Sequence, residues 1–591
     1  MLKDYFLEKV TTAVTTAVEE NKLGSMTAEN GYSLQVEIPK NNQFGDFAIN
    51  VSSLSKFAKM APPQIASTIS EFIEKNGFEI NIVAGFINFK LGKNFLNNII
   101  KNVLETKEKY AQNNIGNGEK IILEYVSANP TGPFHIGHGR WAAMGSALAN
   151  ILKYSGYQVF QEFYINDAGS QIQKLGKSLH IRVLQELGIA IDFPEDEEEA
   201  KNFYTGDFLI PTAKDFIKDN KEFSESLKKS SLKELNTESL KTLSNYAKAK
   251  MLKMQKELLK TFRTHFDNFY SEQELHNSGE VQKCIDELNK QGMLYEKEGA
   301  LWFKSSNFGD DQDRVIKKSD GSYTYLTADI AYHYDKLKRG FDKLINIWGA
   351  DHHGYVARMR ASIEALGYNP DSLEVLLGQL VNLVIKGEQV RMGKRTKMIT
   401  LDDLINDVGV DATRFWMIMR SIDTTLDFDV ELAKSNSDEN PVFYVQYAHA
   451  RACSILRNAT SERMDTVNNK IHPAILNVAE LENDLSNISE QVLNTLWAES
   501  DEKAVESTKK LILKIEEFKA IVVYAAINRT PYLLTKYVQE LAANFHQFYT
   551  FSRVLVDNKD LMVARLAIVK TVSIVLKSAL ELIAVSAPEK M

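Results

Sequence analysis

The stretch that most constrains the fold lies around residue 130, where a strand, a tight turn and a helix follow one another directly. Residues 121–126 (IILEYV) are mostly apolar and rich in β-branched side chains, as in a buried strand. Residues 141–152 carry small and apolar side chains at helical spacing. The turn between them, residues 127–140, contains two prolines and three glycines. This order predicts the first unit of a parallel α/β sheet.

The start of the predicted helix is suited to binding a phosphate. A helix N-terminus presents unpaired backbone N–H groups and the positive end of the helix dipole. His135 and His138 are three residues apart and therefore share one face of the first turn. Two imidazoles at this place can stabilise charge that develops on a triphosphate. Histidines also occur as ordinary core or surface residues, so the pair alone does not decide the function.

The chain of 591 residues is too long for one hydrophobic core and predicts about three to four domains. Residues 1–110 are expected to form a small α/β domain, with strands at 32–38 and 86–91 and helices at 47–60 and 63–76. The polar residues 112–120 are typical of a linker.

Residues 116–372 are expected to form the second domain. A second strand at 159–165 follows the first helix, and strand–helix–strand order indicates a doubly wound parallel sheet. A helical insertion rich in lysine and glutamate is expected at about 191–271. The second half of the sheet is predicted from three further strands, at 300–303, 323–326 and 344–348.

Residues 373–435 are expected to connect the sheet to the last domain. They contain the sequence VRMGKRTK at 390–397, with four cationic side chains in eight residues. Such a run is often only a solvated surface, but it could also close over a polyphosphate, with Lys394 as a point charge. Residues 436–591 show amphipathic helical spacing almost throughout and predict an all-α bundle, whose exposed aromatic side chains could stack on unpaired bases.

Composition excludes several classes of protein. The net charge of −8 argues against indiscriminate binding of polyanions. The longest apolar run, residues 520–527, is too short to span a membrane. Two cysteines can supply neither a disulfide framework nor a cysteine-rich zinc site, so we expect a cytoplasmic protein without a protein-bound metal site.

With these motifs in view, the chain resembles the class I aminoacyl-tRNA synthetases, and among them the arginyl-tRNA synthetases of bacterial type. The class signature His-Ile-Gly-His is intact at 135–138, whereas residues 391–395 (RMGKR) depart from the second signature, Lys-Met-Ser-Lys-Ser, at three of five positions. Longer matches to the arginyl family are 127–133 (SANPTGP), 164–169 (YINDAG), 309–314 (GDDQDR), 325–329 (YLTAD), 348–355 (WGADHHGY), 444–451 (YVQYAHAR) and 585–591 (VSAPEKM).

The resemblance implies a two-step reaction. ATP activates L-arginine to arginyl-adenylate, and the arginyl group then passes to the terminal adenosine of tRNA(Arg), with Mg²⁺ on the phosphates. It implies that His135, His138 and Lys394 are the catalytic residues. The ATP-binding residues implied are Pro130, Gly132, His135, Gly137, His138, Gly349, Asp351, His352, His353, Met392 and Lys394.

The resemblance also implies an arginine site made of Glu124, Asn129, Tyr325 and Asp329. A guanidinium is planar and always charged, so carboxylates in fixed geometry suit it. Tyr325 and Asp329 are four apart and would share one face of a helix. Other roles are open: Glu124 could face solvent from its strand, and Asp329 could be a charge near a helix N-terminus.

The flanking domains gain roles from the same resemblance. The N-terminal domain, with the sequence PKNNQFGDFAIN at 39–50, is expected to contact the elbow of tRNA. The C-terminal bundle is expected to bind the anticodon, with Tyr549, Phe551 and Met591 as candidate contacts. We expect a monomer whose partners are tRNA(Arg), L-arginine and ATP, with no membrane.

Three alternatives compete with this interpretation. A cysteinyl-tRNA synthetase would need zinc ligands that two distant cysteines cannot supply. A nucleotidyltransferase that does not act on tRNA would have no use for the helical C-terminal third. A tRNA-binding paralogue without enzymatic activity should lack His135, His138 or the carboxylates, which are all present; only the altered residues 391–395 favour it.

Overall fold

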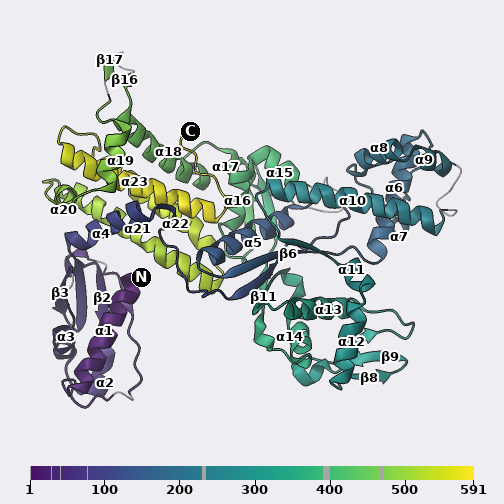
Figure 1. Ribbon diagram of the computed structural model, residues 1–591, viewed down its shortest axis with the longest axis horizontal. Helices are drawn as coiled ribbons and strands as arrows, with labels where there is room; N and C mark the ends of the chain where they lie inside the picture. The colour runs from purple at the N-terminus through teal and green to yellow at the C-terminus, as the bar shows by residue number, and fades with distance from the viewer. Residues whose placement is uncertain are drawn as a thin grey trace.

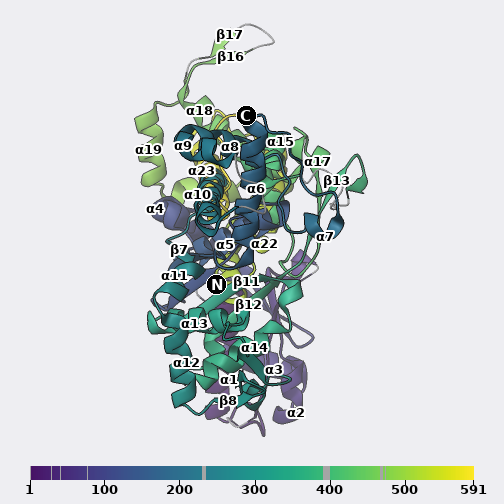
Figure 2. The same cartoon turned by 90° about the vertical axis from the view of Figure 1, so that its right-hand side faces the viewer.

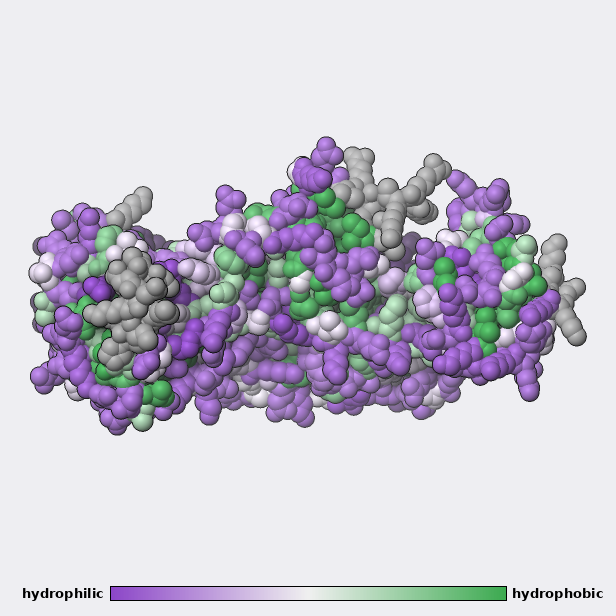
Figure 3. Space-filling view, turned by 90° about the horizontal axis from the view of Figure 1, so that it is seen from above, coloured by the Kyte–Doolittle hydropathy of each residue, from purple (hydrophilic) through white to green (hydrophobic). Residues whose placement is uncertain are grey.

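The computed structural model describes residues 2–27, 30–39, 41–75, 77–228, 235–390, 399–465, 470–472 and 474–591. The molecule is elongated (Figure 1), with the N-terminal domain at the lower left and the C-terminal helices above it. The central parallel sheet lies between these helices and two further groups of elements. The side seen in Figure 3 is hydrophilic over most of its surface. No helix of the described residues is long and apolar enough to cross a membrane.

The N-terminal domain is an antiparallel sheet of order β1-β2-β4-β3 covered by helices. Phe6, Phe47, Phe78 and Phe89 pack ring against ring in its core. Its main elements are α1 (Leu2–Glu19), β1 (Val36–Glu37), β2 (Phe47–Asn50), α2 (Ser55–Ala58), α3 (Pro62–Glu71), β3 (Phe78–Val83) and β4 (Phe86–Leu91).

The helix predicted at 47–60 is confirmed for residues 52–58, but the prediction is wrong for the first four residues, which form β2. These residues pair with β4, from Phe47 opposite Phe89 to Asn50 opposite Phe86. Pairing with a distant strand buries the apolar side chains and overrides local propensity. The strand predicted at 32–38 is reduced to β1, while the strand at 86–91 is confirmed.

The centre of the molecule is a five-stranded parallel sheet of order β12-β11-β5-β6-β7. The strands are β5 (Lys120–Glu124), β6 (Gln158–Ile165), β7 (Asn268–Ser271), β11 (Lys343–Gly349) and β12 (Leu373–Gly378). Helix α5 (Ile136–Tyr154) follows β5, α13 (Tyr325–Lys338) precedes β11, and α14 (Tyr355–Ala365) lies between β11 and β12 in the chain. The predicted doubly wound parallel sheet is confirmed, and β5 lies at its middle.

A helical lobe is inserted between β6 and β7 and has a hydrophobic core of its own (Figure 1). It comprises α6 (Ser170–Glu186), α7 (Glu197–Ala200), α8 (Leu209–Asp219), α9 (Lys221–Leu227) and α10 (Thr237–Thr261). The long helices α6 and α10 pack against each other. The lobe thus begins at α6, close to the carboxyl end of β6.

A second, smaller insertion follows β7. It comprises α11 (Glu272–Asn277), α12 (Glu280–Lys290), β8 (Leu294–Lys297), β9 (Ala300–Phe303) and β10 (Arg314–Lys317). Residues 300–303 form a strand as predicted, but this strand belongs to the separate antiparallel sheet β10-β9-β8. Tyr325 and Leu326, predicted as strand, begin α13. Periodicity indicates a strand without specifying its partner.

The segment before the C-terminal domain contains a three-stranded sheet, β14-β13-β15. Its elements are β13 (Val381–Ile385), β14 (Glu388–Val390), α15 (Leu401–Val408), α16 (Val410–Ile418), β15 (Leu426–Asp429) and α17 (Val430–Lys434).

The C-terminal domain is a helical bundle, as predicted. Its elements are α18 (Pro441–Thr460), β16 (Arg463–Asp465), β17 (Lys470–His472), α19 (Val478–Ser486), α20 (Glu490–Asn494), α21 (Glu502–Asn528), α22 (Tyr532–Phe551) and α23 (Lys559–Leu582). Helix α4 (Lys93–Thr106) packs against it from the N-terminal side. The hairpin β16–β17 projects from the bundle (Figure 2).

Candidate active site

The carboxyl ends of β5, β6 and β11 and the residues just after β7 border one cavity of about 270 Å³. This is the edge of a parallel sheet at which ligands bind in open α/β folds. Polar side chains dominate its lining, which includes Glu124, Ser127, Tyr164, Asn166, Glu272, Tyr325, Asp329, His333, His352 and Tyr355.

Three of these side chains are carboxylates. Glu124, at the end of β5, is buried; its Oε2 accepts a hydrogen bond from Lys336 Nζ at 2.6 Å and its Oε1 one from Ser127 Oγ at 2.9 Å. Asp329, in the second turn of α13, accepts a hydrogen bond from the Tyr355 hydroxyl at 2.6 Å. Glu272 is the first residue of α11 and is also buried. Lys336 therefore balances one carboxylate of the three.

The other two carboxylates are difficult to ionise. Burial, together with the charges of Asp329 and Asp167, raises the pKa of Glu272 to about 7. Burial also raises the pKa of Asp329 to about 6; the charge of Glu124 adds to this rise and the Tyr355 hydrogen bond opposes it. Among the described residues, the cavity thus has more carboxylates than lysine or arginine side chains to pair with them.

A buried polar network fixes one wall of the cavity. Lys336 Nζ donates to Asn346 Oδ1 at 3.1 Å, which turns the amide nitrogen of Asn346 toward His333 Nε2 at 2.8 Å. His333 Nδ1 lies 2.8 Å from the Asp329 carbonyl, which can only accept, so Nδ1 carries the proton and Nε2 accepts. Burial and the Lys336 charge lower the pKa of His333 to about 3, so the ring is neutral.

His135 and His138 lie at the start of α5, as predicted. His135 caps the helix: its Nδ1 accepts from the Gly137 N–H at 3.1 Å, and His138 Nδ1 accepts from the His135 N–H at 3.2 Å. The two rings are stacked with centroids 3.6 Å apart. Burial lowers the pKa of both, for His138 to about 3. Each ring is therefore neutral, with Nε2–H as its remaining donor.

The structure brings several predicted residues together. Glu124, Tyr325, Asp329, Gly349 and His352 line the same cavity, although 73% of Tyr325 is exposed. The remaining predicted residues lie nearby in the chain. Pro130 and Gly132 are on the turn into α5, Gly137 is in its first turn, and Asp351 and His353 are exposed beside His352. Met392 and Lys394 lie outside the described residues.

Asn129 does not line the cavity; its hydrogen-bond partners belong to the helical lobe. Its Nδ2 donates to Gln171 Oε1 on α6 at 2.9 Å. Gln255, buried on α10, donates its Nε2 to the carbonyls of Asn129 at 3.0 Å and Gly132 at 2.9 Å. The lobe therefore holds the turn that precedes the two histidines.

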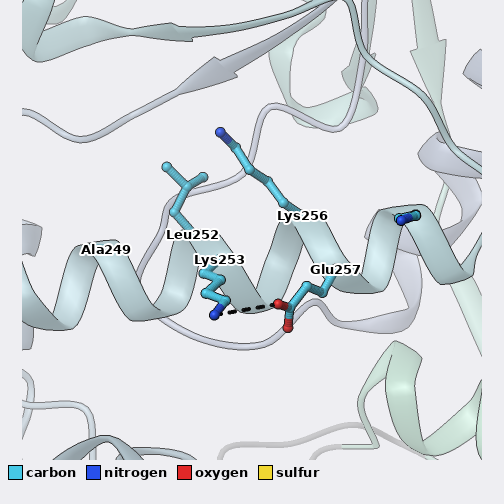
Figure 4. Close-up of a pocket in the computed structure, with 6 residues that line it drawn as sticks. Ala249, Leu252, Lys253, Lys256 and Glu257 are labelled. Carbon is cyan, nitrogen blue, oxygen red and sulfur yellow. Dashed lines mark ion pairs between the residues drawn. The ribbon is translucent and has the colours of Figure 1, made fainter. Parts of the chain in front are cut away.

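A different face of α10 is open. Ala249, Leu252, Lys253, Lys256 and Glu257 form a stripe along it (Figure 4), where Lys253 and Glu257 make an ion pair at 3.9 Å. The stripe consists of one helix face, mainly aliphatic stems and charged ends. It borders none of the residues of the acidic cavity.

The sequence analysis did not identify Glu272 or Tyr355 as site residues. Both line the cavity, and Glu272 supplies one of its three carboxylates. Glu272 comes immediately after the short strand β7, and the carboxyl end of a parallel strand is a signal that could have identified it. The helical insertion predicted at about 191–271 includes residues 268–271, so the prediction places no strand before Glu272.

A second cavity of about 470 Å³ lies in the C-terminal bundle. Tyr549 and Met591, both predicted to contact tRNA, line it together with Tyr447 and Arg451. The Arg451 guanidinium lies over the Tyr549 ring, 4.4 Å from its centroid. Phe551 does not line this cavity; its ring lies 5.8 Å from Lys503 Nζ.

Comparison with known proteins covers the whole chain. The family "tRNA synthetases class I (R), catalytic domain" matches residues 99–425, the "DALR anticodon binding domain" residues 445–591 and the "Arginyl tRNA synthetase N terminal domain" residues 8–91. The arginine–tRNA ligase 1 of Halalkalibacterium halodurans is 43% identical over 597 residues, and the arginine–tRNA ligase of Bacillus subtilis is 42% identical over 602 residues. Each match covers 100% of this chain and 99% of the relative.

Among solved structures, the arginyl-tRNA synthetase of Thermus thermophilus has a similar fold, with a TM-score of 0.70. The match covers 100% of both chains at 22% sequence identity. It supports the order of the three structural parts, from the N-terminal sheet to the C-terminal bundle.

Proposed function

The chain belongs to the arginyl-tRNA synthetase family, and on this premise we propose how its residues carry out the reaction of that family. The reaction activates L-arginine with ATP and transfers the arginyl group to the 3′-terminal adenosine of tRNA(Arg), releasing AMP and pyrophosphate. The observation that carries the assignment of substrate to site is the excess of carboxylates in the cavity at the end of β5.

We assign arginine to this cavity, with Glu124, Tyr325 and Asp329 as its binding residues and Glu272 as an addition. Asn129, which does not line the cavity, is proposed to hold the backbone groups of the substrate from the turn before α5. Among the described residues, neither Glu272 nor Asp329 forms an ion pair with a lysine or arginine. A guanidinium supplies the missing charge and a planar set of donors. A neutral amino acid would leave buried carboxylates unpaired, which is costly, and lysine lacks the planar fork.

ATP is assigned to the turn 130–138 and to residues 349–353. The neutral His135 and His138 offer Nε2–H donors beside the positive end of α5, where they stabilise charge developing on the phosphates. Gly349, at the end of β11, permits close approach of the nucleoside, which Asp351, His352 and His353 would hold.

Lys394 and Met392 are proposed to complete the ATP site. Support comes from the described residues that follow: the Leu401 N–H donates to the Phe134 carbonyl at 2.8 Å, so the C-terminal flank of residues 391–398 lies beside His135.

The described residues contain no group of three His, Cys, Asp or Glu able to hold a metal ion. We therefore propose that Mg²⁺ enters with the phosphates of ATP.

In the proposed mechanism the arginine carboxylate attacks the α-phosphorus of ATP and pyrophosphate leaves. The 2′-hydroxyl of the terminal adenosine then attacks the activated carbonyl and AMP leaves. The protein contributes positioning and charge stabilisation and forms no covalent bond with the substrates.

Residues 1–110 and 436–591 are proposed to bind the elbow and the anticodon of tRNA, respectively. Tyr549 and Met591 support the second assignment because they share a cavity with the cationic Arg451. An aromatic ring beside a guanidinium is suited to stacking on an unpaired base. We propose that the monomer is active.

The test is aminoacylation of total tRNA with each of the twenty amino acids by the wild type and by Asp329→Asn. We expect charging with arginine alone, and a fall of about 10²- to 10³-fold in kcat/KM for arginine in the variant, because a buried guanidinium loses its charged partner. Asp335→Asn on the same helix, where Asp335 pairs with Arg339 at 3.0 Å, is the matched control. Unchanged kinetics in Asp329→Asn with intact tRNA binding would refute the arginine site.

A further inference from the structure

The N-terminal domain joins the rest of the molecule where β4 passes into α4 through the single residue Gly92. Helix α4 packs against α20, α21 and α23 of the C-terminal bundle. Asn97 on α4 is fully buried there: it donates to Glu490 at 2.6 Å and Asn494 at 3.1 Å and accepts from Trp497 Nε1 at 2.8 Å. Helix α4 is thus fixed to the bundle, whereas β4 belongs to the N-terminal sheet (Figure 1). Gly92, whose N–H donates to the Gly77 carbonyl at 2.8 Å, is the single residue that links the two, and we call it the hinge.

The FGD sequence at 44–46, part of the stretch singled out in the N-terminal domain, lies directly at this hinge. Gly45 has φ +134°, and a Cβ there would lie 2.7 Å from the Phe89 carbonyl oxygen, so the position requires glycine. The next residue, Asp46, uses both of its carboxylate oxygens. Oδ2 accepts from the Leu91 N–H at 2.7 Å, and Oδ1 pairs with Lys509 Nζ on α21 at 2.7 Å.

We propose that Asp46 and Lys509 form a latch that sets the angle of the N-terminal domain relative to the C-terminal bundle. One oxygen of Asp46 holds the last residue of β4, on the near side of the hinge. The other holds α21, on the far side. Rotation of the domain about Gly92 cannot proceed without separating Asp46 from Lys509.

The local geometry makes this ion pair stronger than an ordinary surface pair. The side chains of Lys509 and Asp46 are only 20% and 11% exposed, which reduces screening by water. The Leu91 N–H fixes the carboxylate before Lys509 binds it, so little side-chain entropy remains to be lost. Exposed pairs without such support contribute little.

The function of the latch rests on the proposed function, in which the N-terminal domain and the bundle bind distant parts of one tRNA. Two sites on one ligand reinforce each other when their separation is fixed to match it. A latched domain keeps this separation, and a free domain samples orientations in which only one site can bind. The latch should therefore act on affinity for full-length tRNA and not on adenylate chemistry.

The experiment compares Lys509→Glu, Lys509→Met and Lys509→Arg in the full-length enzyme. We expect the KM for tRNA(Arg) to rise about threefold to tenfold in the first two, as for loss of a half-buried ion pair, with kcat and the KM values for ATP and arginine unchanged. Lys509→Arg keeps the charge and should restore the wild-type KM. Small-angle scattering should show a larger radius of gyration for Lys509→Glu.

Lys510→Glu is the matched control, because Lys510 is the next residue on α21, is exposed and pairs with Glu506. It makes the same charge change without touching Asp46. Equal KM values for tRNA in Lys509→Glu and Lys510→Glu would overturn the latch, as would a raised KM in Lys509→Arg equal to that of Lys509→Met. Failure of the wild type to charge tRNA with arginine would instead contradict the proposed function.

Discussion

At the residue scale, the charge of the acidic cavity depends on pH, and the arginine binding that we propose there should depend on pH as well. Glu272 and Asp329 have pKa values raised to about 7 and about 6, chiefly by burial. A guanidinium binds the ionised carboxylates, so at a pH below these pKa values its binding must displace protons from Glu272 and Asp329. The stability of the protein without arginine has the opposite pH dependence. Glu272 binds its proton more tightly in the folded state than in the unfolded state, so the free energy of unfolding falls as pH rises from about 4.5 to about 7.

We expect arginine to bind about tenfold more weakly at pH 6 than at pH 8, from the ionised fraction of Glu272. Glu272→Gln should weaken binding at pH 8 and remove most of this pH dependence. The same variant should melt at a higher temperature than the wild type at pH 8 without arginine, since ionising a buried carboxyl with such a pKa costs about 3 kcal/mol. Titration calorimetry and thermal melts at both pH values measure these effects.

Glu287→Gln on α12, where Glu287 pairs with Lys290, provides the comparison for both measurements. If the affinity of the wild type for arginine is the same at pH 6 and pH 8, Glu272 is not part of the arginine site.

At the element scale, Arg140 ties α5 to the small sheet β14-β13-β15. This side chain is fully buried and makes hydrogen bonds of 2.7–2.8 Å to the carbonyls of Gln379, Ser421 and Thr424. These carbonyls precede β13 and β15, neighbouring strands of the small sheet whose third strand, β14, leads to residue 390. One guanidinium thus ties the helix of the two histidines to the base of this sheet.

We expect Arg140→Lys to slow formation of arginyl-adenylate about tenfold to a hundredfold, because an ammonium cannot reach all the carbonyls and leaves buried acceptors unpaired. The dissociation constant for tRNA should stay at the wild-type value. Single-turnover kinetics and a binding assay separate the two. Arg360→Lys, on the exposed side of α14, is the control. Equal rates of adenylate formation in Arg140→Lys and Arg360→Lys would contradict the role given to Arg140.

The elements predicted from sequence were those whose pattern is local. Residues 121–152 form strand, turn and helix in direct succession, so periodicity and turn chemistry sufficed to place His135 and His138. Residues 47–50 form a strand because they pair with the distant strand β4, and that choice is tertiary. Residues 300–303 pair instead with the neighbouring strand β8 in a hairpin, so they do not join the parallel sheet. Glu124 and Asp329 were known only through the family resemblance. The Lys336 that neutralises Glu124 comes from a helix 212 residues away, and no local pattern indicates it.

At the scale of the whole molecule, a buried arginine joins the catalytic half to the bundle. Arg414 on α16 is fully buried and donates to the carbonyls of Phe262 at 2.6 Å and Ile583 at 3.1 Å, and to Ser146 Oγ at 2.7 Å. These partners lie at the end of α10, just after α23 and on α5. Burial lowers the pKa of Arg414 to about 9. Its bonds cross between the parts of the molecule that we propose to bind ATP and tRNA.

We expect Arg414→Ala to lower the unfolding temperature by several degrees and to split one calorimetric transition into two, because a buried cavity and unpaired carbonyls cost about 3 kcal/mol at the junction. Differential scanning calorimetry measures both effects. Arg457→Ala, at an exposed end of α18, should melt like the wild type. A single transition at the wild-type temperature in Arg414→Ala would mean that the two halves are joined elsewhere.

The pairing of Glu124 with Lys336 has a consequence for engineering the enzyme. Because this carboxylate already has an internal cation, its charge is balanced before any amino acid binds, and Glu124 can accept hydrogen bonds from a charged or an uncharged side chain. An uncharged analogue such as citrulline is opposed by Glu272 and Asp329. A variant that charges tRNA with such an analogue should therefore be sought by replacing these two carboxylates with amides, while Glu124 and Lys336 are left in place as a neutral scaffold.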